Sequence, residues 1–160
     1  MSDSHFAFVL MPFSSPFDDV YKLGIKEPLE SLDIRTERVD EQTFHKETIL
    51  ERIYNHINAA DFIVADMTGR NPNVFYEVGY AHAKKKTCIL LTSSADDIPF
   101  DLKQHRHIVY PNIRHLKDGI RTEAAVVVDD IKANKLRPTR SVEKDYWHLR
   151  ENELFCDWIH

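Results

Sequence analysis

The sequence predicts an α/β fold in which a parallel sheet lies between two layers of helices. Three short apolar runs, at residues 5–11, 62–66 and 88–91, are typical of strands buried on both faces. Segments with helical periodicity separate these runs, and such alternation favours a parallel sheet. We therefore expect a flavodoxin-like three-layer sandwich with a five-stranded parallel sheet in the order 2-1-3-4-5.

Prolines, a glycine and the alternation of apolar with charged residues predict the boundaries of the N-terminal elements. Pro12 ends the first strand, and Gly24 and Pro28 weaken the helix after it. Residues 34–39 alternate apolar and charged side chains, which is typical of an edge strand. The expected elements, in order, are a strand at 5–11, a helix at 17–32, a strand at 34–39, a loop at 40–46, a helix at 48–60 and a strand at 62–66.

The C-terminal elements follow from helical spacing. In a helix at 73–84, Asn73 is a plausible N-cap, although Pro72 could instead occupy the first turn. A strand at 88–91 and a short strand at 107–110 complete the sheet. A long helix at 113–135 then has an apolar face made of Ile120, Ala124, Val127, Val128 and Ile131.

The chain is expected to form one domain, residues 1–135, followed by a tail, residues 136–160. The tail opens on a linker-like stretch and is rich in large apolar residues, so we expect it to pack on the domain or to mediate oligomerisation. Its large apolar residues are Tyr146, Trp147, Leu149, Leu154, Phe155, Trp158 and Ile159.

Bulk properties exclude several functions. The net charge of −5 gives no basic footprint for duplex nucleic acid. The N-terminus lacks the pattern of a secretory signal, and no apolar run reaches the length of a membrane span, so we expect a cytoplasmic protein that does not contact a membrane. The nine histidines and two cysteines lack metal-site spacing, and the four glycines form no phosphate loop. We therefore expect neither a metal nor a cofactor.

The strand order predicts where a ligand binds. The chain reverses direction between strands one and three, and ligands of such sheets bind in the crevice at the carboxyl ends of those strands. Met11-Pro12-Phe13 follows the first of them, and Asp66-Met67-Thr68 follows the third. Phe13 is a candidate to stack on a planar base, and the alternative is core packing.

Glu77 is the candidate catalytic residue. It lies about one turn inside the helix that follows Asp66, in otherwise apolar and small company, on a face shared with Asn73, Tyr76 and Tyr80. The helix N-terminus favours an ionised carboxylate unless desolvation outweighs it. The alternative is a solvated acid or a partner for Arg70.

The turn before this helix supplies further candidates. Asp66 either binds ligand or caps the turn, and Arg70 could pair with a phosphate. The full set of candidate substrate-binding residues is Met11, Phe13, Ser14, Asp66, Thr68, Arg70, Asn71, Asn73 and Tyr76.

These motifs resemble a known family. Met11-Pro12-Phe13, the run from Ala60 to Asp66, and above all Asn71-Pro-Asn-Val-Phe-Tyr-Glu-Val-Gly-Tyr-Ala81 are similar to the nucleoside 2-deoxyribosyltransferase-like superfamily and to related bacterial TIR-like proteins. The resemblance spans roughly residues 5–110. It implies that Glu77 attacks the anomeric carbon of a nucleoside or nucleotide, that Phe13 packs on the base, and that Asp66, Asn71 and Asn73 hold the sugar.

One position departs from the family pattern. Transferases of this type commonly carry an aspartate six residues before the glutamate, where this chain has Asn71. An amide donates a hydrogen bond but cannot deliver a proton as an acid. This disfavours transfer between bases and leaves hydrolysis, NAD cleavage or binding without turnover.

The leading hypothesis is therefore cleavage of an N-glycosidic bond in a nucleotide or nucleoside, with NAD among the candidate substrates. The alternative is a non-catalytic, TIR-like nucleotide-sensing or signalling module, and a third possibility is a pure interaction domain. The resemblance also implies a homo-oligomer, because active sites in this family are often completed by a neighbouring subunit. The sequence leaves open the sugar and the 5′-phosphate.

Overall fold

The computed structural model describes residues 4–41, 48–105 and 107–135. Most of the predicted loop at 40–46 and all of the tail lie outside the described residues. The strands are β1 His5–Leu10, β2 Ile34–Arg38, β3 Phe62–Asp66, β4 Cys88–Thr92 and β5 His107–Val109. The helices of eight residues or more are α2 Ile49–Ala59, α3 Pro72–Ala83 and α4 Ile113–Lys135.

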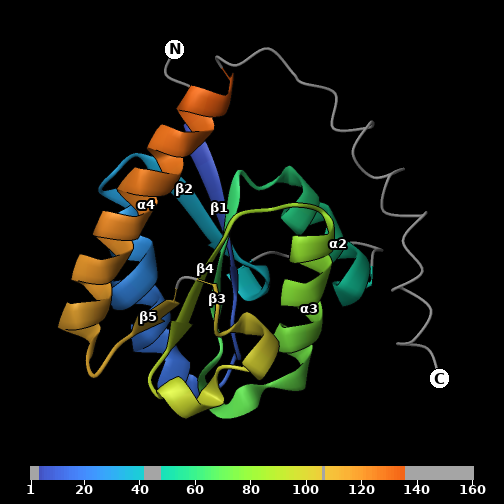
Figure 1. The fold of residues 1–160 in the computed structure, drawn as a ribbon, viewed down its shortest axis with the longest axis vertical. Coiled ribbons are helices and arrows are strands. Elements are labelled where there is room, and N and C mark those ends of the chain that lie inside the picture. The colour runs from blue at the N-terminus through green and yellow to red at the C-terminus, as the bar shows by residue number, and fades with distance from the viewer. Residues whose placement is uncertain (1–3, 42–47, 106, 136–160) are drawn as a thin grey trace.

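The five strands form one parallel sheet in the order β2-β1-β3-β4-β5, which confirms the predicted fold class. Strands β1 and β3 are adjacent, with Leu10 beside Ala65 at their carboxyl ends. Strand β2 lies at an edge of the sheet, as its alternating pattern indicated. Helices cover both faces, with α4 on one side and α2 and α3 on the other (Figure 1).

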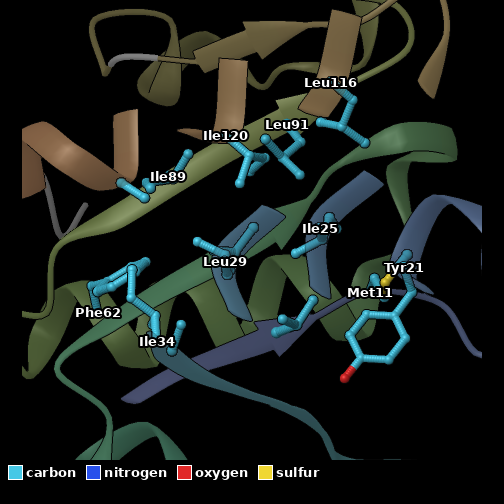
Figure 2. Packing of buried hydrophobic residues seen from close by; sticks show 14 of the residues in the cluster. Met11, Tyr21, Ile25, Leu29, Ile34, Phe62, Ile89, Leu91, Leu116 and Ile120 are labelled. Carbon is cyan, nitrogen blue, oxygen red and sulfur yellow. The ribbon is translucent and has the colours of Figure 1, made fainter. Parts of the chain in front are cut away.

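The core consists of two apolar clusters separated by the sheet. Along β1, alternate residues enter different clusters: Val9 joins the one under α4, and Phe8 joins the one under α2 and α3. Both side chains are almost completely buried. The α4 cluster, drawn in Figure 2, includes Leu91, Leu116 and Ile120. Burial on both faces explains why the strands read as near-continuous apolar runs.

The predicted helix at 17–32 is replaced by three shorter pieces. They are a 3₁₀ turn, η1 Ser15–Phe17, a π-helix, η2 Val20–Lys26, and a single turn, α1 Glu27–Glu30. Pro28 has no N–H to donate to the turn before it, which breaks the α-helical ladder. At this junction the Glu27 N–H bonds to the carbonyl of Lys22, five residues back.

Close packing holds this irregular segment on α4. A Cβ atom at Gly24 would lie 2.6 Å from Leu116 Cδ2, so only glycine lets η2 approach the buried leucine this closely. No helix in the described ranges is long and apolar enough to cross a lipid bilayer.

Candidate active site at the carboxyl edge of the sheet

Asp66, the last residue of β3, is fully buried, and both of its carboxylate oxygens accept hydrogen bonds. Its carboxylate accepts hydrogen bonds from the Thr68 N–H at 2.9 Å and from the Tyr110 hydroxyl at 2.6 Å. Burial raises the pKa of Asp66, and the bonds from Thr68 and Tyr110 oppose that shift. The side chain therefore caps the turn after β3, which was one of its two interpretations, and contact with a ligand stays a prediction.

The start of α3 confirms the second of the two sequence-based alternatives, Pro72 in the first turn, and corrects the first, Asn73 as N-cap. Asn71, and not Asn73, is the N-cap: its side-chain oxygen accepts from the N–H groups of Asn73 at 2.9 Å and Val74 at 3.3 Å. Pro72 occupies the first turn, where its missing N–H costs nothing. The Asn73 side chain is exposed. The oxygen of Asn71 is thus committed to the helix, and its amide N–H groups are what it offers a ligand.

Glu77 lies in the second turn of α3 and is half-buried. No hydrogen bond or ion pair to its carboxylate occurs among the residues that the structure describes. Desolvation raises its pKa to about 7, so desolvation outweighs the effect of the helix N-terminus. Arg70 is not its partner, because the guanidinium contacts Asp96 and Asp97 instead.

Three tyrosines from α2 and α3 lie close to Glu77. The ring of Tyr54 stacks on Tyr80, with centroids 4.2 Å apart, and its hydroxyl donates to the Tyr76 hydroxyl at 3.0 Å. The bond to Tyr76 is the main cause that raises the pKa of Tyr54 to about 12, and the nearby charge of Glu77 adds to it. Tyr76 is 63% exposed, so it is accessible to a ligand or to another chain.

The residues that follow β1 differ in how deeply they are buried. Met11 is packed inside the core under α4, whereas Phe13 and Ser14 are exposed. Phe13 is 52% exposed and is therefore not a core residue. The buried guanidinium of Arg38 lies 5.7 Å from the Phe13 ring centroid and pairs with Asp40 at 2.6 Å. An aromatic ring free on one side is what stacking on a base requires.

Arg70 lines a pocket of about 350 Å³ between α3 and the β4–β5 connection, together with Phe75 and Phe100. Phe75 and Glu77 are two positions apart on a helix, which places them on nearly opposite sides of it. Glu77 is not among the residues that line this pocket. Arg70 and Glu77 are therefore not brought together, and a phosphate contact of Arg70 stays a prediction.

Sequence reasoning missed several residues at this edge. Tyr110 comes directly after β5, so its position at a strand end was a usable signal. The main-chain N–H of Ser93, after β4, donates to Thr68 Oγ1 at 2.9 Å. In the described part of the chain, no group of three His, Cys, Asp or Glu side chains is placed to hold a metal ion.

The family relationship follows from the sequence as a whole. The model of the nucleoside 2-deoxyribosyltransferase family matches residues 9–136. The chain belongs to this family. The matched range includes every candidate site residue, from Met11 to Glu77. A search of curated protein sequences gave no match.

Solved structures share the fold at low sequence identity. A 2-deoxyribosyltransferase from Bacillus psychrosaccharolyticus is 14% identical, with TM-score 0.59, over 76% of this chain and 95% of that one. The CMP N-glycosidase BcmB from Clostridium botulinum is 17% identical, with TM-score 0.58, over 74% and 98%. The TIR domain of TRR-2 from Hydra magnipapillata is 14% identical, with TM-score 0.58, over 79% and 97%. The match spans 65% of a Leishmania mexicana 2-desoxiribosyltransferase chain.

Proposed function

We propose that this protein cleaves the N-glycosidic bond of a nucleoside or nucleotide, with Glu77 as the residue that attacks or stabilises the anomeric carbon. The observation that carries the proposal is the state of Glu77 in a chain that belongs to the nucleoside 2-deoxyribosyltransferase family. It is a half-buried carboxylate without a polar partner among the described residues, and its pKa is raised to about 7. Perturbed acids of this kind concentrate at functional sites.

The reaction parallels that of a retaining glycosidase. A Glu77 carboxylate oxygen approaches C1′, the bond from C1′ to the base nitrogen breaks, and its electron pair leaves with the base. The sugar is then held either as an ester of Glu77 or as an oxocarbenium ion beside it. Attack on C1′ by water displaces the Glu77 carboxylate and completes hydrolysis, and the proton that the water loses passes to the departed base or to solvent. Attack by a nitrogen of a second base displaces the carboxylate in the same way and completes transfer.

Asn71 favours bases that leave without a proton. Its side-chain oxygen caps α3, and its amide group cannot act as a general acid. A nicotinamide attached to ribose carries a positive charge and departs as a neutral molecule. Ordinary bases leave as anions unless they are protonated. We therefore place NAD and related cationic nucleotides ahead of ordinary nucleosides, and hydrolysis ahead of transfer.

Chromatography of released bases tests the proposed function. The wild type is incubated separately with NAD, with ribonucleotides and with deoxyribonucleotides, each with and without a second base as acceptor. Base release from at least one substrate is the expected result. If all substrates remain intact, the enzymatic proposal is wrong. Tight binding of an intact nucleotide would then favour the alternative, a nucleotide-sensing module, and the TIR domain that shares this fold is consistent with that alternative.

Replacing Asn71 with aspartate is expected to change substrate preference. Aspartate caps helices as well as asparagine does, so α3 should be retained, and it adds an acid that can protonate a leaving base. We expect Asn71→Asp to speed base release from ordinary nucleotides by about tenfold or more below pH 6. NAD cleavage should change little. Asn71→Ala is the control, since it removes the cap and adds no acid. If Asn71→Asp changed base release from NAD and from ordinary nucleotides equally, residue 71 would not determine which bases leave.

We also propose that the protein is a homo-oligomer assembled through its tail. The support is the apolar character of residues 136–160 in the sequence and the exposed aromatic side chains of the domain, among them Tyr76 and Phe13. Deleting residues 137–160 should convert the oligomer to a monomer in light scattering. An unchanged mass would remove the tail from the interface.

A further inference from the structure

The turn that joins β3 to α3 has an unusual backbone. Gly69 and Arg70 are consecutive residues in the left-handed region, with φ of 77° and 55°. Glycine adopts this conformation without cost, but arginine does not. A strained residue persists only when its surroundings hold it there, and such residues cluster at functional sites.

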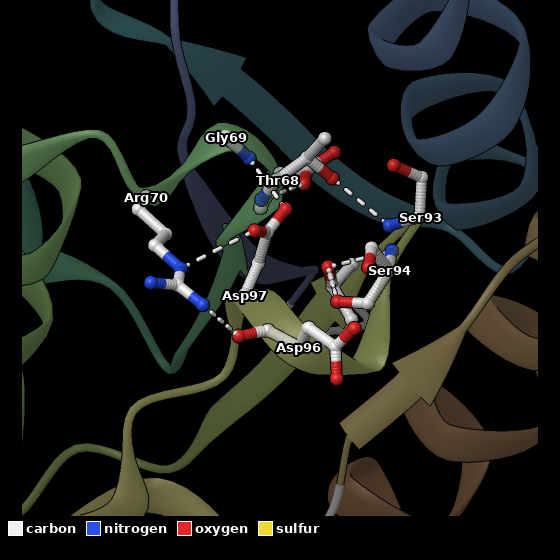
Figure 3. Close-up of polar contacts among 9 residues, drawn as sticks. Thr68, Gly69, Arg70, Ser93, Ser94, Asp96 and Asp97 are labelled. Carbon is white, nitrogen blue, oxygen red and sulfur yellow. Dashed lines mark hydrogen bonds and ion pairs between the residues drawn. The ribbon is translucent and has the colours of Figure 1, made fainter.

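A single carboxylate from the β4–β5 connection holds both residues. Asp97 Oδ2 accepts the Gly69 N–H at 2.8 Å, and Asp97 Oδ1 lies 3.5 Å from Arg70 Nε. Arg70 Nη2 also donates to the main-chain carbonyl of Asp96 at 2.6 Å. Figure 3 shows the guanidinium and the Gly69 amide converging on this carboxylate. The same connection reaches Thr68 through the Ser93 N–H.

The turn determines how α3 begins. Arg70 is followed at once by the N-cap Asn71, and Glu77 is six residues further along the same continuous helix. A helix is rigid over this distance, so a change in the direction of its first turn moves the Glu77 side chain. The chain thus offers a route from Asp97, through the turn at Gly69 and Arg70, to the carboxylate at residue 77.

We propose that Asp97 is a positioning residue, which clamps the left-handed turn at Gly69 and Arg70 and thereby fixes the direction in which α3 presents Glu77. The inference depends on the proposed function, because it matters for catalysis only if Glu77 acts on a substrate. Asp97 itself takes no part in bond breaking.

Two variants of Asp97 and one neighbour test the clamp. Asp97→Ala removes both contacts, and Asp97→Asn keeps an oxygen for the Gly69 N–H but loses the charge that faces Arg70. Asp96→Ala is the matched control, because Asp96 contributes only its main-chain carbonyl to the clamp. We expect kcat for base release to fall by about 10²-fold in Asp97→Ala with little change in KM. Asp97→Asn should lie between, and Asp96→Ala should match the wild type.

A rescue experiment separates positioning from general damage to the fold. Arg70→Gly removes the backbone strain that the clamp resists, because glycine adopts a positive φ without steric cost. Adding Asp97→Ala to Arg70→Gly should therefore reduce kcat much less than Asp97→Ala does in the wild type. Equal losses in both backgrounds would overturn the clamp. If Asp97→Ala alone fails to fold, the double variant is compared with Arg70→Gly: a small loss of kcat supports the clamp, and a loss of about 10²-fold overturns it.

A readout without substrate keeps the clamp independent of the proposed function. Titration of the Glu77 carboxyl carbon by NMR should give a pKa near 7 in the wild type, and in Asp97→Ala a value closer to that of a solvated glutamate. If no substrate is cleaved but this pKa moves, the proposed function fails and the clamp stands. If the pKa and kcat of a folded Asp97→Ala protein both equal those of the wild type, the clamp is wrong.

Discussion

Replacement of Glu77 by glutamine is expected to reduce base release by about 10³-fold or more, with KM nearly unchanged. Glutamine has the same size and shape as glutamate, so binding should survive. It cannot carry the negative charge that attacks C1′ or stabilises an oxocarbenium ion. The measurement is steady-state base release on whichever substrate the wild type cleaves.

A matched control shows that the position matters and not the charge alone. Glu30 is an exposed glutamate whose carboxylate lies 4.0 Å from Lys26, far along the chain from the crevice segments. Glu30→Gln removes the same charge and should retain wild-type activity. A Glu77→Gln enzyme that works as well as Glu30→Gln would exclude Glu77 from the chemistry.

The pH dependence of the rate should reflect the same carboxyl group. Because the attacking form is the ionised one, kcat/KM should rise as the pH increases through about 7 and then level off. An ordinary solvated glutamate would give a rise near pH 4.3. A profile that is already flat at pH 5 would contradict the desolvated state of Glu77.

The second large effect of Glu77→Gln is on stability: the substitution that lowers activity is expected to raise the free energy of unfolding. The pKa of Glu77 is raised on folding, so the native state binds more protons than the unfolded chain between about pH 4.5 and pH 7. The free energy of unfolding therefore falls as the pH rises through this window, and above it the penalty is fully present. Glu77→Gln removes the penalty, because an amide does not ionise.

We expect Glu77→Gln to be more stable than the wild type at pH 8, by about 1–2 kcal/mol after allowance for the solvent that reaches a half-buried group. This corresponds to a Tm higher by about 2–8 °C. The difference should shrink below pH 4.5, where the carboxyl is protonated in both states. Melting curves at pH 8 and pH 4 measure it, and a variant less stable than the wild type at pH 8 would refute the prediction.

The fold was predictable because β1, β3 and β4 are buried on both faces and β2 alternates like an edge strand. Runs such as Phe6–Leu10 are apolar at every position, which is typical of strands buried on both faces. The alternation of strands and helices then allows few chain topologies. Gly24 and Pro28 indicated a weakened helix after β1, but not its division into a 3₁₀ turn, a π-helix and a single α-turn. The close packing of Gly24 on Leu116 joins residues far apart in sequence, and no local pattern marks it. The cap at Asn71 was missed by two residues, a common uncertainty at helix ends.

The candidate site was predictable only where its residues belong to one segment. Asp66, Asn71 and Glu77 lie within twelve positions on a strand, a turn and a helix, so their spacing is readable. Asp97 reaches the same end of the sheet through a tertiary contact, and no local pattern marks it. Tyr110 also reaches it through a tertiary contact, and its only local signal is its position directly after β5. The raised pKa of Glu77 could not be foreseen, because the helix N-terminus and burial act on it in opposite directions.

A crystal structure of the Glu77→Gln protein with an uncleaved nucleotide would show whether Glu77 faces the anomeric carbon. We expect the nucleotide to lie at the carboxyl ends of β1 and β3, with C1′ about 3–3.5 Å from the side-chain oxygen of residue 77. A nucleotide bound with C1′ remote from residue 77, for example in the pocket beside Phe100 on the other side of α3, would contradict it.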